Sequence, residues 1–320
     1  MAEPRDVVIV GSGPAAYTAA LYTARAGLAP LVFEGSLWAG GALMTARAVT
    51  DFPGFPAGVD GPELADELRS QAYRFGAQLV SDDILEADLR GPLKSLTDAR
   101  GTVHRARAVV LATGSRPRRL GLPGEEELAG RGVHASAVLD GHAMRRRDVA
   151  VVGGGDSALQ EALALAEIAA SVTVVHRGTS LRASKALQAA AAAHPRIAFH
   201  PGARVTALIG RSELTGLRLH CEPHGQEREL AVRGLVVAIG REPRTELFAE
   251  QVDLDGDGYP VTAAPSTRTS LPGVFAAGDV ADRHYRQAVT AAAAGCAAAL
   301  DVERFLASTR PARVGASLPR

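Results

Sequence analysis

The chain has 320 residues, of which 47% are hydrophobic and 22% charged, so it can bury a large core and is neither disordered nor fibrous. Its 35 basic residues balance 35 acidic ones, which argues against nucleic acid or an anionic membrane as a partner. Its cysteines, Cys221 and Cys296, are too few for a disulfide scaffold and too far apart for a CxxC pair. No signal peptide or membrane span is recognisable, so we expect a cytoplasmic protein.

The first predicted strand, Val7–Val10, runs into a glycine turn and an alanine-rich helix. The turn fits the G-x-G-x-x-G/A dinucleotide fingerprint: Gly11 makes the tight turn, Gly13 lets the backbone approach a pyrophosphate, and Ala16 packs helix on strand. Glu34 ends the next apolar run and is predicted to accept a hydrogen bond from a ribose hydroxyl.

A second unit of the same kind begins at the predicted strand Val149–Val152 and carries Gly153, Gly155 and Ala158 at the fingerprint positions. Its second strand ends in basic residues instead of an acid. Because arginine pairs with a 2′-phosphate, this ending favours NADPH over NADH. The basic residues are His176, Arg177 and Arg182.

Three further apolar runs predict buried strands of parallel sheets: Val109–Leu111, Val172–Val175 and Leu235–Ile239. Gly and Pro clusters near residues 114–123 and 240–243 predict domain crossovers. The acidic loop Asp253–Gly258 resembles a calcium loop but lacks the final glutamate, so we interpret it as a solvated turn and expect no metal site.

The first fingerprint, at 11–16, and four further blocks, at 112–114, 153–158, 273–279 and 285–288, make nearly the whole chain resemble the low-molecular-weight thioredoxin reductases. The resemblance implies an α/β fold with two Rossmann-like nucleotide-binding domains, each of three layers (ββα). The NADPH domain, residues 116–244, would be inserted into an FAD domain made of residues 1–115 and 245–320. It also implies a homodimer and the cofactors FAD and NADPH.

The resemblance also assigns cofactor positions. Asp279 would hold the ribityl chain of FAD, and Arg286, Gln287 and Ala288 would begin the helix whose N-terminus faces the flavin. The other implied FAD positions are Gly41, Ala42, Asp51, Thr113, Gly114 and Gly278, of which Ala42 and Asp51 depart from the family's usual Gln and Asn. The other implied NADPH positions are Asp156 and Ser157.

The most informative departure lies at the family's redox-active CxxC, where Ser136 and Leu139 replace both cysteines. Neither side chain can exchange with a disulfide, so the dithiol relay cannot operate. Asp140, the family's proton donor, is retained, and His134 and His142 flank the motif, either as acid/base groups or as polar loop residues.

We therefore expect an FAD-dependent NAD(P)H oxidoreductase in which reduced flavin passes electrons directly to a small molecule or a redox protein other than thioredoxin. Ser136, Leu139, Asp140 and His142 are its candidate catalytic residues. One alternative is a metabolite oxidase or dehydrogenase with a vestigial NADPH domain, favoured by Gly178 and Gln160, which replace the family's usual arginine and acid. The other alternative is a non-catalytic flavoprotein redox sensor.

Overall fold

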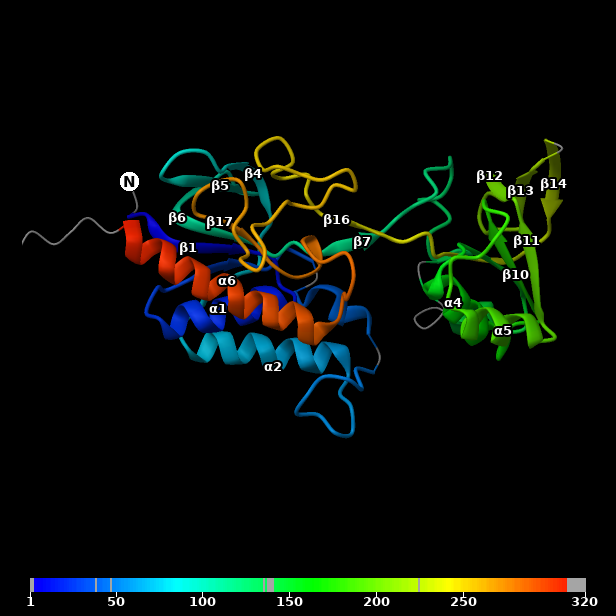
Figure 1. Ribbon diagram of the computed structural model, residues 1–320, viewed down its shortest axis with the longest axis horizontal. Helices are drawn as coiled ribbons and strands as arrows, with labels where there is room; N and C mark the ends of the chain where they lie inside the picture. The colour runs from blue at the N-terminus through cyan, green and yellow to red at the C-terminus, as the bar shows by residue number, and fades with distance from the viewer. Residues whose placement is uncertain are drawn as a thin grey trace, which may run out of the picture. The chain divides into compact units, whose positions relative to one another are not determined.

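The computed structural model describes residues 3–37, 39–46, 48–134, 136, 141–223 and 225–309. The chain divides into two compact units, unit 1 from residues 1–115 and 243–320 and unit 2 from residues 116–242. A two-stranded sheet of β7 (Ser115–Pro117) and β16 (Arg241–Pro243) contains both chain crossings between the units (Figure 1).

Unit 1 is built on a seven-stranded sheet in which β3, β2, β1 and β6 lie side by side in parallel, β17 extends the parallel set beside β6, and β4 and β5 form an antiparallel meander with β6. The strands are β1 (Arg5–Val10), β2 (Leu31–Phe33), β3 (Gln78–Val80), β4 (Ile84–Asp88), β5 (Lys94–Asp98), β6 (Val103–Leu111) and β17 (Val274–Ala276). The helices are α1 (Pro14–Arg25), α2 (Gly61–Arg74) and α6 (Ala288–Thr309), with short 3₁₀ turns η1 (Gly41–Thr45) and η3 (Gly278–Val280).

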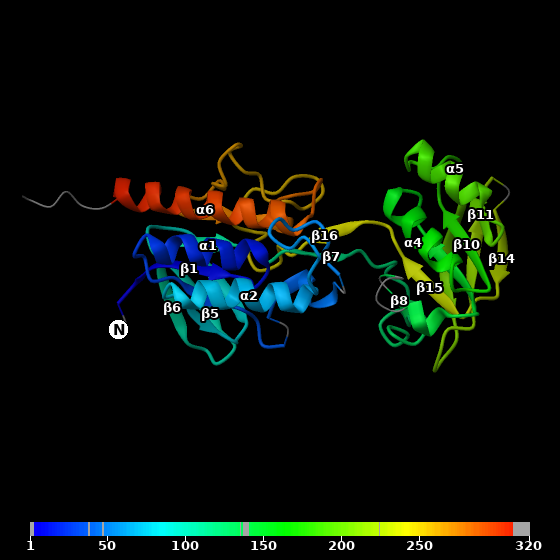
Figure 2. The same ribbon diagram turned by 90° about the horizontal axis from the view of Figure 1, so that it is seen from below.

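The alternation of side chains along β1 divides unit 1 into layers. Val7 and Ile9 pack with α1 and α6, whereas Val8 and Val10 pack on the opposite face with residues of the meander and with Phe248. The helices α1, α2 and α6 lie together on one face of the sheet (Figures 1 and 2). All four β1 residues are at most 7% exposed, as expected for a strand covered on both faces.

Unit 2 repeats this plan around a five-stranded parallel sheet in the order β11, β10, β9, β15, β8. The parallel strands are β8 (Val133–His134), β9 (Asp148–Val152), β10 (Ser171–His176), β11 (Ile197–Pro201) and β15 (Gly234–Val237). One face packs against α4 (Asp156–Ala166) and α5 (Lys185–Ala193), and the other against the antiparallel strands β12 (Ala203–Ile209), β13 (Gly216–Cys221) and β14 (Gln226–Leu230). The 3₁₀ turn η2 (Gly141–Met144) precedes β9.

The predicted fold class is confirmed, since both units are three-layered and Rossmann-like and the sequence of unit 2 interrupts that of unit 1. All five predicted strands form, although the run predicted for 235–239 ends as a strand at Val237. Ala238 still donates to the carbonyl of Val152 at 2.8 Å, and Gly240, with φ of +103°, then turns the chain. No helix in the described ranges combines the length and hydrophobicity needed to cross a bilayer.

Candidate cofactor sites and the altered redox motif

The first fingerprint makes a tight turn between β1 and α1. Gly11 has φ of +132°, and a Cβ at this position would overlap the carbonyl oxygen of Ala112, so only glycine fits. Gly13 is the N-cap of α1, and the first turn of α1 contains no acid. Apart from the neighbours of Gly13 in the chain, no described residue has an atom within 4 Å of where its side chain would begin. The N–H groups of this helix end are thus available to an anionic group such as a phosphate.

Several other predicted FAD residues gather around this turn. A Cβ on Gly41 would lie 3.1 Å from Cα of Gly13, and one on Gly278 would lie 2.7 Å from Cβ of Ala15. Asp279, the next residue in η3, accepts a hydrogen bond from Ser115 Oγ at 3.3 Å. Segments from four parts of the chain therefore converge on the N-terminus of α1.

Two further predicted residues, Thr113 and Gly114, follow β6 and bind the segment that returns from unit 2. Thr113 Oγ1 donates to the carbonyl of Arg244 at 2.6 Å, and Arg244 N donates to the carbonyl of Gly114 at 3.0 Å. Ala42 and Asp51 are exposed, and no hydrogen bond or ion pair joins either to the fingerprint within the described ranges.

Glu34, predicted to accept from a ribose hydroxyl, is 3% exposed and is held by two protein side chains. Tyr17 donates its hydroxyl to Oε1 at 2.7 Å, and Arg69 donates Nε to Oε1 at 2.8 Å and Nη2 to Oε2 at 3.0 Å. A carboxylate has about four acceptor sites, and these two side chains occupy three of them. Burial and the bond to Glu34 raise the pKa of Tyr17, while the bond to Glu34 is the main cause of the raised pKa of Arg69.

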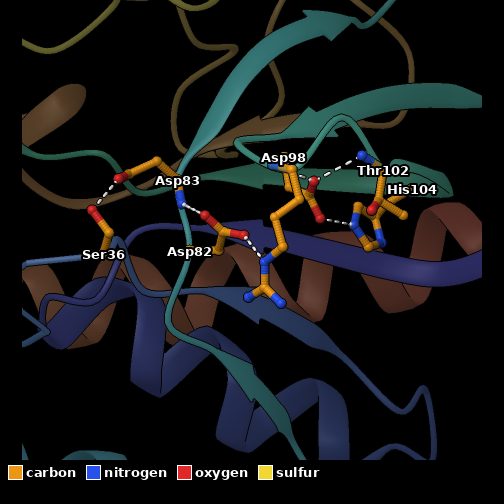
Figure 3. A network of polar contacts seen from close by, with 7 residues as sticks. Ser36, Asp82, Asp83, Asp98, Thr102 and His104 are labelled. Atoms are coloured by element: carbon orange, nitrogen blue, oxygen red, sulfur yellow. Dashed lines mark hydrogen bonds and ion pairs between the residues drawn. The ribbon is translucent and has the colours of Figure 1, made fainter.

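The loop after Glu34 rests on a polar network (Figure 3). Gly35 N donates to the carbonyl of Asp82 at 3.2 Å, and Ser36 Oγ donates to the carboxylate of Asp83. Arg100 pairs with Asp82 at 2.8 Å. This network joins the carboxyl end of β2 to the start of β4 and so fixes the backbone that follows Glu34.

Asp98 caps the turn between β5 and β6 in the same network. It accepts from Thr102 N at 2.8 Å and contacts His104 Nε2 at 2.9 Å (Figure 3). The ring of His104 packs edge-on against Phe33, with 4.9 Å between the ring centres. The hydrogen bond with His104 is the main cause that lowers the pKa of Asp98. The network is thus connected to the residue that precedes Glu34.

The predicted flavin-facing residues Arg286, Gln287 and Ala288 lead into α6. Arg286 has φ of +50°, uncommon for a residue with a side chain, and its Nε is buried with no hydrogen-bond partner in the described structure. An unsatisfied buried donor beside a helix N-terminus fits a bound group that carries acceptors.

The second fingerprint has the same geometry in unit 2. A Cβ on Gly153 would overlap the carbonyl oxygen of Ala238. The space where a Gly155 side chain would begin has no atom of the described structure within 4 Å, apart from its neighbours in the chain. Asp156, in the first turn of α4, accepts from Ser184 N at 2.6 Å, and Ser157 is exposed.

The loop after β10 folds back onto this fingerprint. Arg182 N donates to the carbonyl of Gly154 at 2.7 Å, which fixes the base of the Arg182 side chain beside the turn. Arg177 and Arg182 are exposed, and neither forms an ion pair with another described residue. His176 is 6% exposed and lies against Gly154, and burial lowers its pKa.

Of the residues expected to stand at the family's CxxC, the structure describes Ser136, whose Oγ donates to Glu161 Oε1 on α4 at 2.9 Å. Leu139 and Asp140 lie outside the described residues. His142 is exposed in η2, and His134 is 6% exposed in β8.

The cysteines lie in different units. Cys221 is the last residue of β13 in unit 2 and Cys296 is in α6 of unit 1. Both are free thiols.

Comparison with known proteins defines the class to which these sites belong. The pyridine nucleotide-disulphide oxidoreductase family matches residues 5–295, and the chain belongs to this family. The chain is 57% identical to a thioredoxin reductase of Streptomyces clavuligerus and 56% identical to one of Streptomyces coelicolor, in each case over 96% of both chains. The crystal structure of Lactococcus lactis thioredoxin reductase matches with a TM-score of 0.83 and 32% identity, over 95% of this chain and 99% of that one.

The protein is therefore a flavin-dependent oxidoreductase of the thioredoxin reductase family, whose proteins use FAD and NADPH. The described residues fit both cofactors. Gly13 and Gly155 each leave room at a helix N-terminus, and the orphaned donor of Arg286 lies at the start of a third helix.

Sequence reasoning missed the residues that support this chemistry from a distance along the chain. Tyr17 and Arg69 bind Glu34 from α1 and α2, and Tyr259 binds Arg286. Each of these contacts spans 17 to 35 residues, so no local spacing indicates them.

Proposed function

We propose that this protein oxidises NADPH and passes the electrons from reduced FAD to an acceptor other than thioredoxin, without a dithiol relay. In this proposal unit 1 binds FAD at Gly11, Gly13, Glu34 and Asp279, and unit 2 binds NADPH at Gly153, Gly155, Arg177 and Arg182. When bound, FAD accepts a hydride equivalent and releases two electrons and a proton to the acceptor.

The observation that carries the proposal is the composition of the motif. A dithiol relay needs two thiols that can approach each other, and the CxxC positions hold Ser136 and Leu139. Cys221 and Cys296 are held in separate units, within a strand and a helix. The Ser136 hydroxyl is engaged with Glu161, and a serine hydroxyl has no disulfide chemistry in any case.

The experiment is a thioredoxin reduction assay with NADPH, run beside an anaerobic assay of flavin bleaching by NADPH. We expect bleaching of the flavin without reduction of thioredoxin or of an aromatic disulfide. Thioredoxin turnover at the rate of an ordinary member of the family, after alkylation of Cys221 and Cys296, would contradict the proposal.

A second candidate is an oxidase or dehydrogenase that takes its electrons from a metabolite. It is favoured by Gly178, which stands where the family usually has the second arginine for the 2′-phosphate. Failure of NADPH to bleach the flavin over minutes, with NADPH shown to be bound, would favour this candidate.

The resemblance also supports a homodimer that works in the cytoplasm with a small-molecule or redox-protein acceptor. Sedimentation of the FAD-loaded protein tests the dimer, since a monomer at micromolar concentration would contradict it.

A further inference from the structure

The acidic loop Asp253–Gly258, which is predicted to be a solvated turn, is bound to the segment that leads into α6. Asp255 closes the loop on itself, because its Oδ1 accepts from the backbone N–H of Asp257 at 2.8 Å and of Tyr259 at 3.1 Å. Arg283 pairs with Asp255 and, at 3.4 Å, with Asp257. Its guanidinium also lies 5.2 Å from the centre of the Tyr259 ring, within cation–π range.

The bound segment, residues 282–287, has an ordered backbone of its own. The carboxylate of Asp282 accepts from the backbone N–H groups of His284, Tyr285 and Arg286 at 2.8, 3.0 and 3.1 Å. Partial burial opposes ionisation of Asp282, but these three donors outweigh it and lower its pKa. The segment passes through Arg286 in the left-handed conformation, which persists in a residue with a side chain only when its surroundings impose it.

Tyr259 adds a side-chain contact to these backbone constraints. It is 3% exposed, and its hydroxyl accepts a hydrogen bond from Arg286 Nη2 at 2.8 Å. The guanidinium is therefore fixed at one end, while its buried Nε has no partner in the described structure. Arg286 lies two residues before α6, so the position of its guanidinium and its backbone conformation determine how the first N–H groups of α6 are presented.

We propose that Tyr259 is a positioning residue for FAD. By holding Arg286, it sets the direction of the N-terminus of α6 and thereby both the affinity for the flavin and its reduction potential. A helix N-terminus stabilises negative charge within its first turn, and reduced flavin is the more negative form. Displacement of this end weakens the binding of reduced flavin more than that of oxidised flavin. The inference rests on the proposed binding of FAD in unit 1.

The test is the variant Tyr259→Phe, which removes one hydroxyl and keeps an aromatic ring beside the guanidinium of Arg283. Tyr73→Phe is the matched control, because Tyr73 is 69% exposed on α2. Three quantities are measured: the FAD dissociation constant of the apoprotein by flavin fluorescence, the midpoint potential of the fully loaded protein, and the melting temperature of the apoprotein.

We expect Tyr259→Phe to weaken FAD binding about tenfold and to lower the midpoint potential by about 30 mV, which corresponds to a further factor of ten against the reduced form of a two-electron couple. Tyr73→Phe should leave both unchanged. The potential is measured on loaded, folded protein, so a purely structural role of Tyr259 would not move it.

An unchanged potential in Tyr259→Phe, with or without a lower melting temperature, would overturn the inference. Wild-type protein that takes up no FAD at all would instead overturn the proposed function, so the two failures are distinguishable. If Tyr259→Phe does not fold, Asp255→Asn is the second variant, because it weakens the ion pair with Arg283. It should also lower the midpoint potential. An unchanged midpoint potential in Asp255→Asn would count against the inference.

Discussion

The guanidinium of Arg69 donates two hydrogen bonds to the carboxylate of Glu34, at 2.8 and 3.0 Å, although the two residues lie 35 positions apart in the sequence. The Glu34 side chain is completely shielded from solvent, whereas that of Arg69 is 40% exposed. Arg69 thus keeps a buried charge compensated at the end of β2, where the ribose of FAD is expected. The Arg69–Glu34 pair therefore contributes to the stability of unit 1 and also holds the carboxylate that we propose binds FAD.

The substitution Arg69→Gln should lower the free energy of unfolding of the apoprotein by about 2 kcal/mol, the usual value of a hydrogen bond to a charged group. The partial exposure of Arg69 keeps the loss below that of a fully buried pair. Urea denaturation measures it. Arg74→Gln on the same helix is the control, since Arg74 is exposed. Equal stability of both variants would show that Glu34 does not need its partner.

The fingerprints could be predicted from the sequence because they depend on the backbone conformation of a few consecutive residues between a strand and a helix. Gly11 and Gly153 each occupy a backbone conformation that other residues rarely adopt, directly after a strand and before a helix. The partners of Glu34 and Arg286 could not be predicted, because α2 and the acidic loop reach them only through tertiary packing. The acidic loop is a turn with Asp253 and Asp257 exposed, in agreement with the prediction, but its ion pairs with Arg283 could not be predicted from local composition.

The substitution Gly295→Ala should disrupt the packing of α6 on α1. A Cβ at this position would overlap the carbonyl oxygen of Ala15, and a helix backbone cannot move aside cheaply. Overpacking of this kind costs about 1–3 kcal/mol. Gly256→Ala is the control, because its Cβ would meet no described residue within 4 Å other than its neighbours in the chain. Denaturation midpoints that agree for the two variants would mean that the helices separate more easily than this geometry implies.

Lowering the pH should reduce the free energy of unfolding of the apoprotein, because His176 is buried. Burial lowers its pKa in the folded state, so the unfolded chain binds a proton below about pH 6.5 while the folded chain does not. The stability that depends on neutral His176 is therefore fully present above pH 6.5. It is lost as the pH falls toward the pKa of His176 in the folded protein, and the free energy of unfolding decreases by up to about 1.4 kcal/mol per pH unit. The pKa of His200 is also lowered, first by burial and second by the positive charge of Arg228.

Urea denaturation at pH 7.5 and pH 5.5 measures this loss. The variant His176→Gln should flatten the dependence, whereas His142→Gln, at an exposed position, should leave it as in the wild type. A wild-type slope retained in His176→Gln would assign the dependence to other groups.

The choice of NADPH over NADH should depend on Arg182 and Arg177. Removal of either side chain loses charge-assisted hydrogen bonds of about 1.5–3 kcal/mol, which corresponds to NADPH binding weaker by roughly 10- to 100-fold. Binding of NADH should not change, because it lacks the 2′-phosphate. Titration calorimetry of Arg182→Ala and Arg177→Ala measures both, with the exposed Arg204→Ala in β12 as control. If NADPH and NADH bind equally well to the wild type and to both variants, neither arginine binds the phosphate.

The number of electrons that the protein takes up from NADPH is the sharpest test of the proposal that it works without a dithiol. A protein whose electron carrier is FAD alone takes up two electrons per chain from NADPH, whereas a flavin and a disulfide together take up four. Because Cys221 and Cys296 belong to different units, anaerobic titration of the wild type should end at two. The double variant Ser136→Cys with Leu139→Cys restores the family's spacing and should raise the endpoint toward four, and the single variant Ser136→Cys is its control and should remain at two. An endpoint of four in the wild type would mean that a thiol pair forms after all, and the variant Cys221→Ser would then identify whether Cys221 contributes to it.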